Sequence, residues 1–290
     1  MELFVQTVVS GMLVGGLYAA IGVGLSLVFG IMGLTNIAHG SLMILASFFV
    51  MFFSRQVTGG VVTALLLTLA IMALIGALTQ GLLINRVLDK GPESALLVTF
   101  GLAIIAQNVL QLVFGADYKS ISSPFASVNV IDTRWVIVSG EYMVNFLVSV
   151  AMLLALHLMI RKTRLGRSIR AAASNVVAAE LMGVDTKRAY IYAMCLAMLT
   201  GSMGGLLVGQ TFGFYSYSGM SYLIIAFGVV VIGGMGSILG TLIGGFILGL
   251  AQLLGAYFFG PGVQVLVGYL ALLVILALRP RGLLSNMTRK

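Results

Sequence analysis

Apolar residues fill nine stretches of this chain, separated by short polar or glycine-rich connections. A helix needs about 20 mostly apolar residues to cross a bilayer, and most of the stretches approach that length. The pattern predicts an all-α integral membrane protein, a polytopic bundle of eight or nine transmembrane helices in a single domain over residues 1–290. The expected helices are 5–31, 37–54, 61–84, 95–114, 141–160, 190–210, 221–236, 238–255 and 262–279.

Two places leave the number of spans open. The stretch 37–54 is short and begins with polar residues, so a broken or re-entrant segment is an alternative there. Between 221–236 and 238–255 lies only a glycine-rich link, so these two stretches are either two helices or one bent element.

The composition also indicates a protein that lies in a lipid bilayer. It is 60% hydrophobic and 8% charged, with a mean hydropathy of +1.13, whereas soluble domains carry roughly 25% charged residues. The net charge of +8 does not indicate nucleic-acid binding, because the cations cluster between apolar stretches. Cys195 is the single cysteine, so an intrachain disulfide is excluded.

Charge also predicts the orientation, because loops rich in Lys and Arg stay in the cytoplasm. The segment 161–188 and the tail with Arg279, Arg281, Arg289 and Lys290 are the most basic parts, so both are expected inside. The loop 115–140 is then outside. Nine spans place the N-terminus outside and eight place it inside. The first apolar stretch is longer than a signal peptide requires, so we expect it to be retained.

The segment 161–188 is the longest polar stretch, and it is a candidate docking site for another protein. Residues 168–181 have helix-forming alanines and apolar spacing, and Gly183 is placed to end that helix. A charged loop is usually only solvated, but this one contains a core of small residues, Ala-Ala-x3-Gly, that fits a groove on a partner. The candidate docking residues are Arg167, Arg170, Ala178, Ala179, Leu181, Met182 and Gly183.

Two polar groups within the apolar stretches are candidates for a solute path or gate. One is the run Asn36, His39, Gly40 and Ser41, in which Asn36 is a candidate helix N-cap. The other is Gln107 and Gln111, which share one helix face. The plainer alternative for both groups is hydrogen bonding between packed helices.

Several kinds of chemistry are missing from the sequence. All eight acidic residues fall in loops or at expected helix ends, which argues against an ion-coupled carrier. None of the five lysines follows a glycine, so a G-x4-G-K-[ST] ATP site is absent. His39 and His157 lack zinc-site spacing. We therefore expect no enzyme activity and no cofactor bound by this chain, and uphill transport would draw energy from another chain.

Glycines at four-residue spacing predict close helix packing, as in Gly11 with Gly15 and Gly245 with Gly249. The stretches Phe29–Gly33 and Phe227–Val230, each followed by a Gly-Ser step, form a weak internal echo. The echo predicts a pseudo-repeat of two halves.

The sequence 177–183, Val-Ala-Ala-Glu-Leu-Met-Gly, resembles the EAA-x3-G loop of permease subunits of ABC importers, with Val177 where that family has Glu. Residues 163–171 and 179–184, together with the N-terminal runs 11–30 and 36–40, are similar to branched-chain amino acid permeases of the LivH type.

The resemblance implies a bacterial inner-membrane permease subunit for branched-chain or other amino acids. It also implies two partner ABC ATPases that bind ATP and dock on the loop 161–189. A second homologous permease, usually a different chain and otherwise a second copy, and a soluble substrate-binding protein would complete the importer. The alternatives are an ABC permease for simple sugars, urea or amides, an ion-coupled secondary carrier and an intramembrane enzyme.

Overall fold

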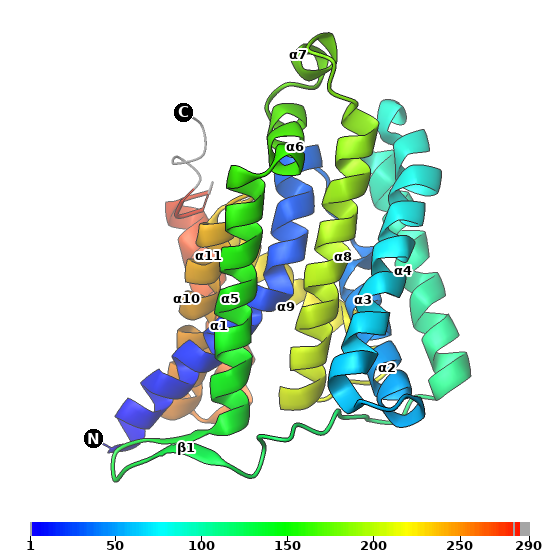
Figure 1. The fold of residues 1–290 in the computed structure, drawn as a ribbon. Helices are drawn as coiled ribbons and strands as arrows, with labels where there is room; N and C mark the ends of the chain where they lie inside the picture. The colour runs from blue at the N-terminus through cyan, green and yellow to red at the C-terminus, as the bar shows by residue number, and fades with distance from the viewer. Residues whose placement is uncertain (1, 281, 285–290) are drawn as a thin grey trace.

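In a computed structural model, which describes residues 2–280 and 282–284, the chain is a bundle of long helices that run between two ends (Figure 1). Eight helices are long and apolar enough to span a membrane, and a ninth, α9, is shorter. The predicted all-α membrane bundle is therefore confirmed. Arg281, Arg289 and Lys290, expected in a cytoplasmic tail, lie outside the described residues. The helices are α1 (Glu2–Met32), α2 (Ala38–Gln56), α3 (Gly60–Leu78), α4 (Pro92–Phe114), α5 (Gly140–Lys162), α6 (Arg164–Ser174), α7 (Val176–Leu181), α8 (Thr186–Thr211), α9 (Gly219–Gly233), α10 (Ile238–Phe259) and α11 (Gln264–Leu278).

The two ends of the bundle differ. One carries α6 and α7 and is called the α7 end; the other carries the start of α1 and strand β1 and is called the β1 end (Figure 1). At the β1 end, strands β1 (Asn129–Asp132) and β2 (Ile137–Ser139) pair as an antiparallel hairpin. The expectation of a plain loop over 115–140 was therefore incomplete.

Helix α1 is the central element. In its most apolar 18-residue window 89% of residues are buried, against 6% for α11. It packs on α10 through glycines: a Cβ on Gly15 would lie 2.7 Å from the Cα of Phe246, and one on Gly249 would lie 2.7 Å from the Cα of Gly15. The close approach predicted from four-residue glycine spacing is thus observed.

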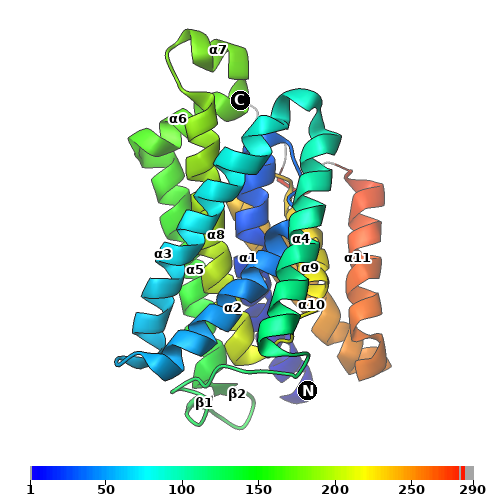
Figure 2. The same ribbon diagram turned by 90° about the vertical axis from the view of Figure 1, so that its right-hand side faces the viewer.

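The outer helices present apolar side chains to the surroundings, which is the pattern of lipid contact. Figure 2 shows α3, α4 and α11 on the periphery of the bundle. Large exposed side chains on them include Leu66, Leu97 and Leu273.

Several connections differ from the sequence expectation. Helix α3 continues through a π-helical turn η1 (Thr79–Leu83) and two 3-10 turns, η2 (Ile84–Arg86) and η3 (Leu88–Lys90). A further 3-10 turn, η4 (Pro261–Val263), precedes α11.

Helices α9 and α10 are separate, because the backbone of Gly233 packs directly against that of Gly240. The alternative of one bent element was wrong.

Helix α9 has 15 residues, about 22 Å of helix, which is short for a bilayer. The preceding loop 212–218 is held to the connection after α4: the backbones of Lys119 and Phe214 exchange hydrogen bonds of 2.7 and 2.8 Å, and the Ser216 hydroxyl donates to the Gly115 carbonyl at 2.6 Å.

The first stretch of the internal echo, at Gly30, packs against Gly236 of the Gly-Ser step that follows the second stretch. A Cβ on Gly236 would lie 2.8 Å from the Cα of Gly30. The pseudo-repeat of two halves itself stays a prediction.

Candidate functional site

Helix α6 forms a fixed platform at the α7 end. The Thr163 hydroxyl caps it by accepting a 3.0 Å hydrogen bond from the N–H of Gly166. Its inner face, with Ile169 and Ala172 at 1% exposure each, packs among side chains of α5 and α8. Because one face is buried and the other is charged, α6 is an amphipathic helix that lies on the bundle.

Helix α7 follows after a break that the sequence analysis did not predict. We expected one helix over 168–181, but Asn175 is extended, with φ −159° and ψ 114°, and its side chain accepts a 3.0 Å hydrogen bond from the N–H of Ala178. Asparagine is a strong N-cap, so it ends α6 and starts α7.

Gly183 ends α7, as predicted. Its φ is +82°, a value that glycine adopts without steric cost. The N–H of Gly183 donates to the Glu180 carbonyl at 2.9 Å, and the N–H of Val184 donates to the Ala179 carbonyl at 3.0 Å. This is the Schellman arrangement of a helix C-terminus, and it turns the chain sharply back toward α8.

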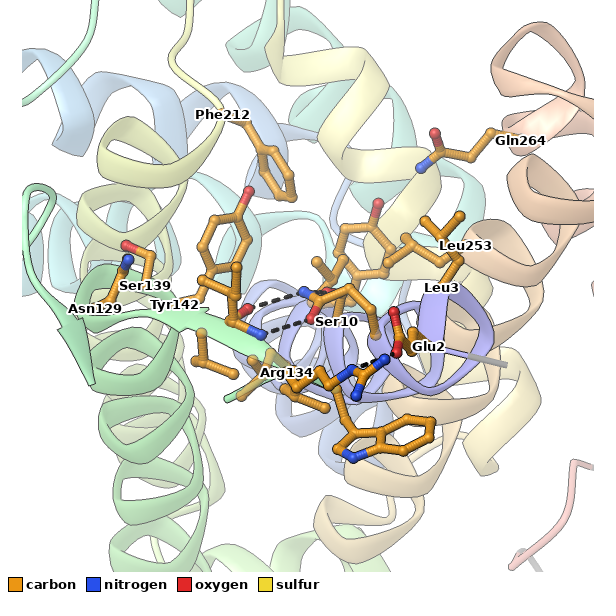
Figure 3. A pocket seen from close by; sticks show the side chains of 18 residues that line it. Glu2, Leu3, Ser10, Asn129, Arg134, Ser139, Tyr142, Phe212, Leu253 and Gln264 are labelled. Carbon is orange, nitrogen blue, oxygen red and sulfur yellow. Dashed lines mark hydrogen bonds and ion pairs between the residues drawn. The ribbon is translucent and has the colours of Figure 1, made fainter. Parts of the chain in front are cut away.

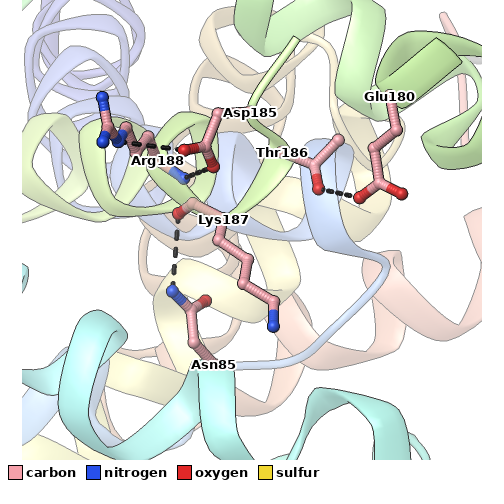
Figure 4. A network of polar contacts seen from close by, with 6 residues as sticks. All are labelled: Asn85, Glu180, Asp185, Thr186, Lys187 and Arg188. Carbon is pink, nitrogen blue, oxygen red and sulfur yellow. Dashed lines mark hydrogen bonds and ion pairs between the residues drawn. The ribbon is translucent and has the colours of Figure 1, made fainter. Parts of the chain in front are cut away.

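Polar contacts tie this turn to the membrane helices (Figure 4). The Thr186 hydroxyl donates to the Glu180 carboxylate at 2.5 Å, so α7 is held to the start of α8. Asp185 caps α8 through the N–H of Arg188 at 3.0 Å and pairs with its guanidinium at 2.9 Å. The Asn85 amide donates to the Lys187 carbonyl at 3.4 Å, which connects α8 to η2. A force on α7 would therefore reach α8 and α3.

The outer surface of α7 is more apolar than the small, smooth face expected from its alanines. Leu181 and Met182 are 83% and 84% exposed, and Val177 is 67% exposed. Ala179 is 5% exposed, so its side chain is not part of this outer surface, and its role in docking stays a prediction. Arg167 and Arg170 are exposed on α6, and the Arg170 guanidinium donates to the Arg161 carbonyl at 3.2 Å. The result is an apolar tip, formed by Val177, Leu181 and Met182, above a basic platform.

The run Asn36 to Ser41 is buried where α1, α2, α8 and α9 meet. The Asn36 side-chain oxygen accepts a 3.0 Å hydrogen bond from the N–H of Ala38, so Asn36 does cap α2. His39 Nε2 lies 3.2 Å from the Ile21 carbonyl on α1. Gly40 packs on the backbone of Gly219 at the start of α9. These contacts match the packing alternative, and a role as a gate stays a prediction.

Gln107 and Gln111 lie apart from that run. Both are half-buried on α4, which contacts the start of α2 through Thr99, whose hydroxyl accepts from the N–H of Ile37 at 3.3 Å. Gln107 is two helical turns beyond Thr99, about 12 Å along the axis. The structure therefore does not bring the six candidate path residues into one site.

A cavity of about 660 Å³ opens at the β1 end (Figure 3). Helix α1, the β1–β2 hairpin and the ends of α5, α8, α10 and α11 surround it. None of the six candidate path residues lines it. The sequence analysis missed this site, since its signal is spread over segments far apart in the chain. Its lining comprises Glu2, Leu3, Gln6, Ser10, Leu13, Val14, Tyr18, Asn129, Arg134, Trp135, Val136, Ile137, Val138, Ser139, Tyr142, Phe212, Leu253 and Gln264.

In the described part of the chain, no three His, Cys, Asp or Glu side chains lie close enough to hold a metal ion together. Cys195 is half-buried, and its thiol lies 3.3 Å from the Ala73 carbonyl. The prominent features are thus an apolar tip at one end of a membrane-spanning bundle and a solute-sized cavity at the other.

These features define the class, a multi-pass membrane protein with a projecting helix between two spans. Residues 7–278 match the family model described as branched-chain amino acid transport system / permease component. The chain belongs to that family.

Individual proteins similar to this chain carry names of the same family. The chain is 31% identical to the high-affinity branched-chain amino acid transport system permease protein LivH of Salmonella typhimurium, over 98% of this chain and 96% of that protein. It is 29% identical to the corresponding permease BraD of Pseudomonas aeruginosa, over 98% and 96%. Among solved structures, PsaBC from Streptococcus pneumoniae in complex with Fab matches 95% of this chain and 91% of that chain, with 13% identity and a TM-score of 0.49.

Proposed function

We propose that this chain is the permease subunit of an ATP-driven ABC importer in a bacterial inner membrane, and that its solute is a branched-chain or related amino acid. The proposal is supported by family membership and by the absence from the sequence of an ATP-binding loop. In this proposal the chain forms the path, together with a second, homologous permease that is either a different chain or another copy. A soluble binding protein delivers the solute to the β1 end.

The observation that carries the coupling part of the proposal is the apolar tip of α7. Large apolar side chains that a segment exposes to water mark a contact with another protein. Insertion of such side chains from a helix into a groove of the partner is a recurring mode of recognition. The tip is held to α8 by the Glu180–Thr186 hydrogen bond. A partner ATPase that binds Leu181 and Met182 would therefore move α8 when ATP binding closes the ATPase.

The position of the tip also fits the expected orientation. Cytoplasmic loops carry an excess of Lys and Arg, and the platform below the tip carries Arg164, Arg167 and Arg170. We infer that the α7 end, with α6 and α7, faces the cytoplasm, where the ATPases reside.

The test is co-purification with the partner ATPases after Leu181→Ser and Met182→Ser are combined. Burying one such side chain stabilises a contact by about 1.5–3 kcal/mol, so their joint loss should weaken ATPase binding at least about tenfold. Thermal stability of the permease should hold, because both side chains are almost fully exposed.

Val130→Ser is the matched control. Val130 is apolar and 55% exposed, but it lies on β1 at the opposite end. Co-purification should survive this change. Normal ATPase binding by the Leu181/Met182 double variant would refute the docking assignment.

A further inference from the structure

The cavity at the β1 end has the size and setting of a small-molecule site. Its volume of about 660 Å³ falls within the range of roughly 300–1,000 Å³ that is usual for ligand pockets. The start of α1 and the β1–β2 hairpin line it, and both lie at the end opposite α7 (Figure 1). A solute from outside would arrive at that end under the proposed function.

One side of the cavity carries charges of both signs. Arg134 Nε, on the β1–β2 turn, lies 3.3 Å from a carboxylate oxygen of Glu2 at the start of α1. Their side chains are 84% and 49% exposed, and exposed ion pairs contribute little stability. A ligand with its own carboxylate and ammonium can therefore break this ion pair, because its carboxylate can pair with Arg134 and its ammonium with Glu2.

Beyond the ion pair the walls combine apolar and polar side chains. Leu13 and Val14 on α1, Leu253 on α10 and Phe212 after α8 supply apolar surface, and the polar lining there includes Ser10, Tyr18, Tyr142 and Gln264. Figure 3 shows Phe212 and Gln264 on the side of the cavity away from the Glu2–Arg134 pair. The paired charges suit a zwitterionic head, and the apolar part of the wall suits an apolar side chain.

We propose that this cavity binds a free α-amino acid with an apolar side chain, whose carboxylate pairs with Arg134 and whose ammonium pairs with Glu2. The inference rests on the proposed function and names a site for its solute within this chain. The opposite charges disfavour a solute with a net charge.

The test uses the purified full chain in lipid nanodiscs, without ATPases. Labelled L-leucine measures occupancy. Trp135 is the only tryptophan of the chain and lines the cavity, so its fluorescence locates the bound ligand. Leucine should bind saturably and change the Trp135 emission. 4-Methylpentanoate is leucine without the ammonium and isopentylamine is leucine without the carboxylate, so each should bind at least about tenfold more weakly.

Arg134→Gln should weaken leucine binding at least about tenfold and should remove the preference for leucine over isopentylamine. Lys119→Gln is the matched control, because Lys119 also pairs with a carboxylate, Asp117, at 3.4 Å on the same connection but outside the cavity. It should leave binding unchanged.

Three outcomes would overturn the inference: no saturable leucine binding, equal binding of all three compounds, or equal effects of the Arg134 and Lys119 variants. A Trp135 response to a change of lipid but not to leucine would assign the cavity to lipid instead. Each outcome leaves ATPase co-purification untouched, so failure of this site is distinguishable from failure of the proposed function.

Discussion

Single glycines determine how closely the central helices approach. A Cβ on Gly245 would lie 2.8 Å from the backbone nitrogen of Ala19, a distance that real side chains avoid. In lipid, where hydrophobic attraction between helices is absent, such backbone contacts supply much of the packing energy. The α1–α10 pair therefore depends on residues without side chains.

Gly245→Val should destabilise the protein by about 1–3 kcal/mol, because the added side chain must push α1 and α10 apart. The measurement is denaturant unfolding of the purified protein in detergent. Gly101→Val is the control, since Gly101 is also inside a helix, but among the described residues no atom beyond its own stretch of α4 lies within 4 Å of an added Cβ. Equal losses for both variants would contradict this account of the α1–α10 contact.

For single residues, the sequence predicted close glycine packing but neither the partner helix nor the burial of Ala179. The spacing of Gly11, Gly15, Gly245 and Gly249 predicted close packing. It could not pair α1 with α10, because spacing along one helix does not identify the helix that packs against it. The motif placed Ala179 among the docking residues, but it could not show that this side chain is buried in the fold.

Among the elements, the β1–β2 hairpin is held to α1 by a side chain. The Gln6 amide donates to the Ile137 carbonyl at 2.9 Å and accepts from the Ile137 N–H at 2.8 Å. The amide thus forms the same two hydrogen bonds with Ile137 that the backbone of a neighbouring strand would form. This contact fixes the hairpin beside the cavity, with the Arg134–Glu2 ion pair as a second, weaker link.

Gln6→Ala should speed hydrogen exchange of the Ile137 amide by about tenfold, because that N–H loses its acceptor and the hairpin loosens. Thr7→Ala is the control, because the Thr7 hydroxyl donates to the Leu3 carbonyl of its own helix, at 2.7 Å. An unchanged exchange rate at Ile137 would show that the hairpin is held by other contacts.

The helices were predictable as elements and the hairpin was not. Each span is an apolar run of nearly the length that a bilayer demands, so hydropathy alone locates it. The strands are four and three residues long and mostly exposed, so they carry no clear alternation. The cavity beside them is assembled from α1, α5, α8, α10 and α11, and no local pattern in the chain shows that assembly.

The charges of the whole molecule are distributed unequally between its ends. The α2–α3 and α4–α5 connections lie at the β1 end (Figures 1 and 2), and the described cations in or next to them are Arg55, Lys119 and Arg134. The α3–α4 connection, the segment between α5 and α8 and the end of α11 lie at the α7 end. The described cations in or next to these are Arg86, Lys90, Arg161, Lys162, Arg164, Arg167, Arg170, Lys187, Arg188 and Arg279. Because cytoplasmic loops are enriched in cations, this bias predicts the α7 end in the cytoplasm and the start of α1 outside.

Single cysteines test that orientation. In a Cys195→Ala background, Val130→Cys should react with a membrane-impermeant maleimide on intact cells. Leu165→Cys, on α6 and outside the apolar tip, should react only after the membrane is opened. Both positions are exposed in the fold, so reactivity reports the side of the membrane. The reverse pattern would contradict the orientation and, with it, docking of cytoplasmic ATPases on α7.

The central claim is that this chain conducts an amino acid only when a separate ATPase drives it. The most direct measurement is uptake of labelled leucine into proteoliposomes that contain the chain with its partner permease, the ATPases and the binding protein. The account predicts uptake that requires ATP, is abolished by combining Leu181→Ser with Met182→Ser, and is absent when the chain alone faces a proton or sodium gradient. Accumulation of leucine by the chain alone under such a gradient would contradict it.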